Sequence, residues 1–172
     1  MLKKILIGLG GFFALLLILP VVLSSKMEIT RSTEVQSSAA ALHSYLADLN
    51  NYPKWNPFSE NDPGSTNQIN GNGVGSVLTW RGEKTGEGKM TITDIQPNQR
   101  IQLKLEFFKP MPGVATIGWT TEMLEANKTR MTWSMDEELP YFQRYFGLFM
   151  KGMIGKTFDR GLMNLKNQIE KP

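Results

Sequence analysis

The pattern of apolar and polar positions divides the chain into an apolar N-terminal run and a longer mixed region. From Ile5 to Leu23 no residue is charged, and most positions are Leu, Ile, Val or Phe. A transmembrane helix needs about 20 predominantly apolar residues. Lys3 and Lys4 precede the run, and basic residues on a short flank favour keeping that flank in the cytoplasm. The pattern predicts a single N-terminal transmembrane anchor over residues 1–25 and an extracytoplasmic domain at the cell membrane over residues 26–172.

Two other interpretations of this run stay open at the level of sequence. A cleaved signal peptide would end near Ser24, but its apolar region is usually about 7–15 residues long and precedes a small-residue cleavage site. The run here is longer and lacks an Ala-x-Ala site. A buried core helix would need protein around every face, and Pro20 fits better near the end of a membrane span. A lipoprotein anchor is excluded because the chain has no cysteine.

The mixed region alternates between apolar and polar positions in several short segments. Residues 100–108 are the clearest, since every second position there is Ile, Leu or Phe. This period of two is typical of a strand with one wet face. Similar alternation, bounded by Gly, Pro and Asn, predicts strands over residues 27–36, 66–70, 75–81, 86–95, 114–125 and 129–138. Consecutive strands with short turns indicate an antiparallel meander.

Helical spacing appears on either side of these strands. Ser37 or Ser38 is a plausible N-cap for a helix reaching Leu49, and a short helical turn follows over Tyr52–Trp55. After Pro140, residues 141–169 read as a long helix, kinked or split by its glycines at 147, 152, 155 and 161. The fold class predicted is therefore α+β.

The long C-terminal helix has two apolar faces. The later face suits packing on a sheet and comprises Ile154, Phe158, Leu162, Leu165 and Ile169. The earlier face lies on nearly the opposite side and comprises Phe142, Tyr145, Phe146, Phe149, Met150 and Met153. Two partners are possible for the earlier face: the core or cavity mouth, or the surface of the bilayer, where aromatic and basic residues are favoured.

Charge and composition narrow the functional classes. The chain of 172 residues has a net charge of +3, and without Lys3 and Lys4 the domain is close to neutral. It shows no basic stripe, so nucleic acid is not an expected partner. With no cysteine and one histidine, His43, thiol catalysis is excluded and a zinc site is not expected. No metal, cofactor or catalytic residue is predicted.

Other polar features have ordinary structural interpretations. His43 is expected at a surface or helix edge, and Asp94 at a turn rather than in a cavity. Residues 136–138, Asp-Glu-Glu, are expected to be a solvated edge. The glycines at 71, 73 and 75 predict a hairpin entry, since no Lys-Ser/Thr follows to complete a phosphate loop.

Four short motifs resemble one protein family. Residues 49–58, LNNYPKWNPF, are similar to its Y-x-x-W-x-P segment, and Gly73-Val74-Gly75-Ser76 to its G-x-G-[ST] entry to a strand. Residues 94–101, DIQPNQRI, resemble its v-x-x-P-x-r-i turn, and Leu162-Met163-Asn164-Leu165-Lys166 the end of its last helix. Their order resembles the START-like (SRPBCC, Bet v 1-like) superfamily, in the bacterial polyketide cyclase/dehydrase-like branch. The resemblance covers residues 26–170.

The resemblance implies a helix-grip fold, in which a curved antiparallel sheet wraps around a long C-terminal helix with a ligand cavity between them. The expected partner is then a hydrophobic or lipid-like small molecule, and the expected function is that of a membrane-tethered binding module. The alternatives are a cyclase/dehydrase-like enzyme, which needs an acid/base pair inside the pocket, and a co-chaperone-like protein-interaction module. The predicted ligand-binding residues are Trp55, Phe58, Trp80, Met90, Phe107, Trp119, Met123, Trp133, Met135 and Phe158. The alternative interpretation of each of these side chains is that it belongs to the ordinary hydrophobic core.

Overall fold

A computed structural model describes residues 2–171 of the chain. It describes their side chains except those of Leu2, Lys3, Ile5, Leu6, Phe13, Ala14, Leu15, Phe146 and Leu148. The elements are, in order, α1 (Leu2–Val22), β1 (Lys26–Val35), α2 (Ala39–Ala47), η1 (Leu49–Lys54), α3 (Phe58–Asn61), β2 (Thr66–Asn70), β3 (Val77–Gly82), β4 (Gly86–Gln96), β5 (Arg100–Lys109), β6 (Gly113–Glu125), β7 (Lys128–Glu138), η2 (Tyr141–Gln143) and α4 (Arg144–Ile169). Each predicted strand is present within two residues of its expected bounds.

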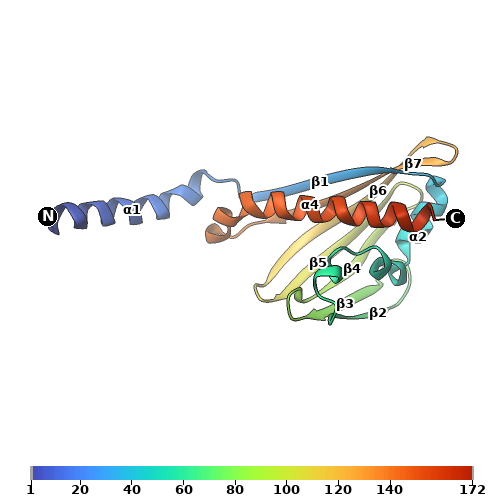
Figure 1. Cartoon of the computed structure of the whole chain (residues 1–172), viewed down its shortest axis with the longest axis horizontal. Coiled ribbons are helices and arrows are strands. Elements are labelled where there is room, and N and C mark those ends of the chain that lie inside the picture. The colour runs from blue at the N-terminus through green and yellow to red at the C-terminus, as the bar shows by residue number, and fades with distance from the viewer. Residues whose placement is uncertain (1, 172) are drawn as a thin grey trace.

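The strands form one seven-stranded antiparallel sheet in the order β1-β7-β6-β5-β4-β3-β2. The first strand closes on the last one because Lys26–Val35 pairs along the whole of β7. The sheet curves, and α4 lies along its inner face beside β1 and β7 (Figure 1). This arrangement confirms the predicted α+β helix-grip architecture.

Local signals explain the ends of several elements. Ser38 caps α2, its side chain accepting a hydrogen bond from the Ala41 N–H at 3.3 Å. Asp48 caps η1 in the same way, with the Asn50 N–H at 3.0 Å. Gly71, Gly73 and Gly75 have positive φ in the loop that leads into β3, as expected for a hairpin entry.

The later apolar face of α4 packs on the sheet, as predicted. Phe158, Leu162 and Leu165 are each at most 1% exposed. The helix is continuous from Arg144 to Ile169, so of the expected kink or split at its glycines the split is wrong. Two of those glycines instead permit close approach: a Cβ at Gly161 would lie 2.8 Å from the Trp133 ring, and one at Gly155 would lie 2.4 Å from the Arg31 guanidinium.

Polar contacts fasten the far end of α4 to β1 and the turn after it. The Lys166 ammonium donates to the Glu34 carbonyl at 2.8 Å, and the Gln36 N–H donates to the Glu170 carboxylate at 2.7 Å. Nearer the middle, Arg31 and Asp159 form an ion pair at 3.3 Å. The helix is therefore held along most of β1.

The earlier apolar face of α4 is divided between the core and the surface. Met150 packs against the hydrophobic core. Phe142, Phe149 and Met153 are 65%, 81% and 64% exposed. The core interpretation is therefore wrong for these three side chains, because they point away from the sheet. Phe146 lies outside the described side chains.

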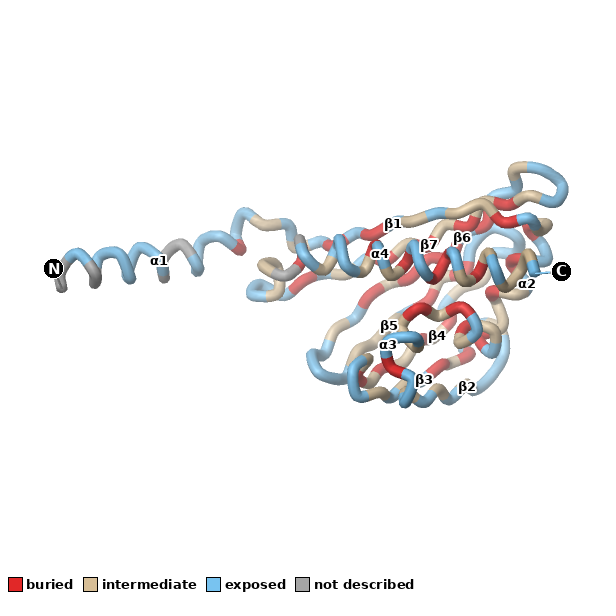
Figure 2. Tube along the Cα trace, in the orientation of Figure 1, coloured by how far each residue is buried: buried red, intermediate tan, exposed pale blue. Residues whose placement is uncertain are grey.

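The apolar N-terminal run forms α1, which extends away from the domain (Figure 1). Most of its described apolar side chains are exposed, for example Ile7 at 68% and Val22 at 75% (Figure 2). The interpretation of this run as a buried core helix is therefore wrong. Over the residues that the structure describes, which leave out the side chains of several apolar α1 positions, no helix is long and apolar enough to cross a membrane.

Candidate ligand-binding face

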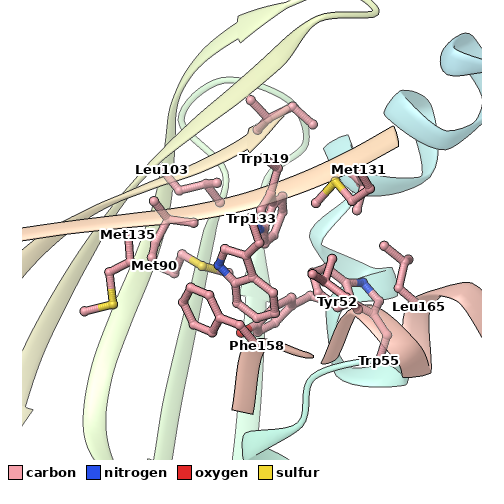
Figure 3. Packing of buried hydrophobic residues seen from close by; sticks show 14 of the residues in the cluster. Tyr52, Trp55, Met90, Leu103, Trp119, Met131, Trp133, Met135, Phe158 and Leu165 are labelled. Atoms are coloured by element: carbon pink, nitrogen blue, oxygen red, sulfur yellow. The ribbon is translucent and has the colours of Figure 1, made fainter. Parts of the chain in front are cut away.

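Five aromatic side chains meet between the sheet and α4, and we call them the aromatic cluster (Figure 3). They are Tyr52 and Trp55 of η1 and the residue after it, Trp119 of β6, Trp133 of β7 and Phe158 of α4. The rings of Trp133 and Phe158 stack with centroids 4.0 Å apart, and Trp55 meets Trp133 edge-on at 5.2 Å. Such pairs add about 0.5–1.5 kcal/mol each beyond the area they bury.

The predicted ligand-binding residues fall into three groups by burial. Six are at most 4% exposed and belong to the packed core: Trp55, Met90, Trp119, Trp133, Met135 and Phe158. Phe58, Trp80 and Phe107 are half-buried and pack at the edge of that core. Met123 is 67% exposed, although Thr121 two residues earlier is buried. It lies near the end of β6, at an irregularity in the pairing with β7, so strand parity alone misplaced it.

Trp80 and Phe107 share one end of the inner face of the sheet. The register places Trp80, Gly88, Phe107 and Gly113 in a row across β3, β4, β5 and β6. The indole of Trp80 lies over Gly88, where a Cβ would come within 2.3 Å of the ring. Trp80 and Phe107 meet edge-on at 5.9 Å. Gly88 and Gly113 leave room on the sheet for the large aromatic side chains of Trp80 and Phe107. Together these residues form an apolar surface that is only partly covered. We call the half-buried residues Trp80, Leu105 and Phe107 the apolar edge.

Glu137 is a carboxylate on this same face, so the expectation of a solvated edge over residues 136–138 is wrong for its middle residue. It continues the inward series Met131, Trp133 and Met135 along β7, and it is half-buried. A Cβ at Gly113 would lie 3.2 Å from its Oε1, which places the carboxylate next to the apolar edge. Burial raises the pKa of Glu137 above its ordinary value of 4.5. Strand parity was the available signal, but the charged neighbours Asp136 and Glu138, which are exposed, obscured it.

Polar donors are also enclosed in the aromatic cluster. Trp119 Nε1 and Trp133 Nε1 are buried and have no hydrogen-bond partner among the described residues. Burial raises the pKa of the Tyr52 hydroxyl well above its ordinary value. An unpaired buried N–H is unfavourable by about 1–3 kcal/mol, so these two indoles are potential donors to a polar atom that enters the cluster.

Two hollows lie outside this face. One, of about 350 Å³, lies between the start of β1 and the start of α4, and is lined by Leu23, Ser24, Lys26, Met27, Glu28, Leu139, Arg144, Gly147 and Lys151. The other, of about 610 Å³, is mostly polar and lies beside the end of α4, lined by Lys54, Glu60, Asn164, Asn167, Gln168, Glu170 and Lys171. Neither is lined by a predicted ligand-binding residue.

The remaining polar candidates do not assemble into a site. His43 is only 6% exposed, so the expected surface position is wrong; α2 packs on β5 and β6 and buries it. Asp94 lies in β4 beside a bulge, not in a turn, and accepts a hydrogen bond from Gln96 at 3.2 Å. Within residues 2–171, the described side chains contain no group of three or more acidic or histidine residues that fits a metal ion.

Several solved structures share this fold. The Aha1 dimer structure from Colwellia psychrerythraea is 21% identical with a TM-score of 0.59, covering 83% of this chain and 96% of that one. The Zhui aromatase/cyclase from Streptomyces sp. R1128 is 16% identical with a TM-score of 0.61, covering 84% and 94%. Norcoclaurine synthase from Thalictrum flavum, solved with dopamine and hydroxybenzaldehyde, is 13% identical with a TM-score of 0.63, covering 89% and 92%. At these identities the likeness establishes the fold alone.

Sequence comparison gives the family itself. A search of curated proteins found no match. The model of the family described as polyketide cyclase / dehydrase and lipid transport matches residues 26–170, which is the whole helix-grip domain. The match confirms the resemblance drawn from the four sequence motifs, and the sheet, the gripping helix and the apolar inner face agree with it. The chain therefore belongs to the polyketide cyclase / dehydrase and lipid transport family, within the Bet v 1-like group of folds.

Proposed function

We propose that this protein binds a hydrophobic or lipid-like small molecule at the apolar edge of its sheet, while α1 tethers it to the cell membrane. The observation that carries the binding proposal is the partly covered apolar surface formed by Trp80, Leu105 and Phe107 on the inner face. Ligand sites are mostly apolar, with a few polar groups that fix orientation. Glu137 supplies such a group beside this surface.

The binding proposal is tested by native mass spectrometry of the full chain, released from a mild detergent after exposure to a total bacterial lipid extract. The wild-type protein should retain a bound mass. Leu105→Gln places an amide in the apolar edge and should lose it, whereas Lys104→Gln, on the exposed outer face of the same strand, should keep it. Absence of any adduct in the wild type, or equal adducts in both variants, would contradict the proposal.

A second candidate function, cyclase/dehydrase-like catalysis, is favoured by Glu137 alone. A half-buried carboxyl whose pKa is raised by burial suits general acid/base chemistry. If the protein dehydrates a polyketide-like substrate, the wild type should yield a product lighter by one water, and Glu137→Gln should not. A substrate that binds and leaves unchanged in both would support the binding module instead. The third alternative, a protein-interaction module, stays a prediction.

The tether rests on the uncharged run from Ile5 to Leu23 and on the exposure of its described apolar side chains in α1. Such a surface is stable in lipid, where the helical backbone satisfies its own hydrogen bonds. Alkaline carbonate extraction should leave the protein in the membrane pellet, with residues from Lys26 onward open to protease from outside. A released product that begins near Ser25 would identify the run as a cleaved signal.

A further inference from the structure

Hydrogen bonds join the start of α4 to the last turns of α1. The side chains of the η2–α4 segment donate to main-chain carbonyls of α1 as follows: Tyr141 Oη to Leu17, Tyr145 Oη to Leu16, and Arg144 Nη1 to Pro20 at 3.0 Å. These carbonyls lie inside the apolar run. The first turn of α4 therefore lies beside the final part of α1 and not beyond its end.

This contact sets the depth of α4 relative to the proposed tether. Leu16 and Leu17 precede the end of α1 at Val22 by one and a half turns, which at 1.5 Å per residue is about 8 Å. Helices that lie in a membrane interface bury their apolar face by about 5–10 Å. If α1 crosses a bilayer, the start of α4 is carried into the interfacial layer.

The exposed side chains of this segment match that layer. Phe142, Phe149 and Met153 are 65%, 81% and 64% exposed, and their spacing places them on one side of the helix. We call these three the interfacial patch. Basic side chains lie on the other side of the same turns, where Arg144 and Lys151 line, with Lys26, the hollow of about 350 Å³ between the start of α4 and the start of β1.

We propose that the interfacial patch inserts into the outer leaflet of the bilayer that α1 crosses. The proposal rests on the proposed tether and adds a second, peripheral contact to it. This second contact also orients the domain on the membrane. The β5–β6 hairpin, next to the apolar edge, points toward the same end of the domain as the start of α4 (Figure 1). The apolar edge then opens toward the membrane, where a lipid-like ligand is found.

The absence of cysteine from the chain allows a direct test. Phe149→Cys and Met163→Cys would each be labelled with nitrobenzoxadiazole in the full chain. Met163 is the matched control, since it lies on the same helix, is 56% exposed and is distant from α1. Both proteins would be reconstituted into phosphatidylcholine–phosphatidylglycerol vesicles that contain an acyl-chain spin-labelled lipid as quencher. Carbonate extraction of the same samples reports the tether independently.

The expected result is a blue-shifted, strongly quenched label at position 149 and a water-like, weakly quenched label at position 163. A water-like label at both positions, in protein that stays in the carbonate pellet, would overturn the interfacial contact and leave the tether intact. Protein that leaves the pellet would overturn the tether, and the interfacial contact with it.

Discussion

Replacing Gly161 by alanine adds one methyl group where α4 packs closely on Trp133 and Pro57. The new Cβ would lie 2.8 Å from Cζ3 of Trp133 and 2.9 Å from Cδ of Pro57. Neither neighbour moves easily, because the Trp133 ring is 2% exposed and stacks on Phe158 at 4.0 Å, and Pro57 is buried. Gly152 provides the matched control: it lies in the same helix, and a methyl group added there would have nothing within 4 Å.

Two effects set the size of the change. Alanine in a helix interior is favoured over glycine by about 0.5–1 kcal/mol, and this gain applies to both variants. Overpacking a core position is unfavourable by about 1–3 kcal/mol, and this loss applies to Gly161→Ala alone. Gly152→Ala should therefore be more stable than the wild type. Since the helical gain cancels between the variants, Gly161→Ala should be about 1–3 kcal/mol less stable than Gly152→Ala.

Thermal unfolding of the full chain in one mild detergent, followed by circular dichroism, would measure this difference. For a domain of about 150–250 residues, 1 kcal/mol shifts Tm by roughly 2–4 °C. The Tm of Gly152→Ala should lie above that of the wild type, and the Tm of Gly161→Ala below that of Gly152→Ala by several degrees. Equal values for the two variants would show that α4 does not contact Trp133 and Pro57 this closely.

Three further predictions concern the core and two carboxylates. Trp119→Ala should lower the free energy of unfolding by about 3–5 kcal/mol, whereas the exposed neighbour Thr120→Ala should stay within about 0.5 kcal/mol of wild type in denaturant titrations; a small effect at Trp119 would contradict its burial. Because burial raises the pKa of Glu137, the wild-type protein loses stability as pH rises from 4.5 through the raised pKa. Glu137→Gln should therefore exceed the wild type in Tm at neutral pH and match it in acid; a gap independent of pH would exclude this cause. Hydrogen bonds from the Thr85 N–H and hydroxyl and from the Lys84 N–H lower the pKa of Asp62, so its stabilisation is present above 3.8 and disappears as pH falls through the lowered pKa. Asp62→Ala should be less stable than wild type at neutral pH, with a gap that narrows in acid, and a constant gap would contradict the assignment.

The order and type of the elements could be predicted from local pattern alone. Strands such as β5 alternate apolar and polar residues because one face of the sheet packs on the core and the other meets water. Ser38 marks the start of α2 because its side chain satisfies a free N–H within the same turn. These signals depend on residues close together in the chain, so no tertiary information is needed to interpret them.

The composition of the candidate site was decided by tertiary structure. Glu137 and Met123 both follow the inward parity of their strands, yet Glu137 is half-buried beside Gly113 while Met123 is exposed at the end of β6. Parity gives the face of a strand, but it does not show where the covering helix ends. The position at which the helix stops covering the sheet depends on how α4 lies along β1. That placement is set by contacts between residues far apart in sequence, such as Arg31 and Asp159.

The two apolar faces of α4 show the same division. Their existence follows from helical spacing in the sequence, because residues three or four positions apart share a side. Which face is buried depends on the close approach at Gly155 and Gly161, which turns Phe158 toward Trp133 and leaves Phe149 exposed. Side-chain size and spacing determine that a helix has an apolar face, whereas burial of that face depends on a partner surface that only the folded sheet provides.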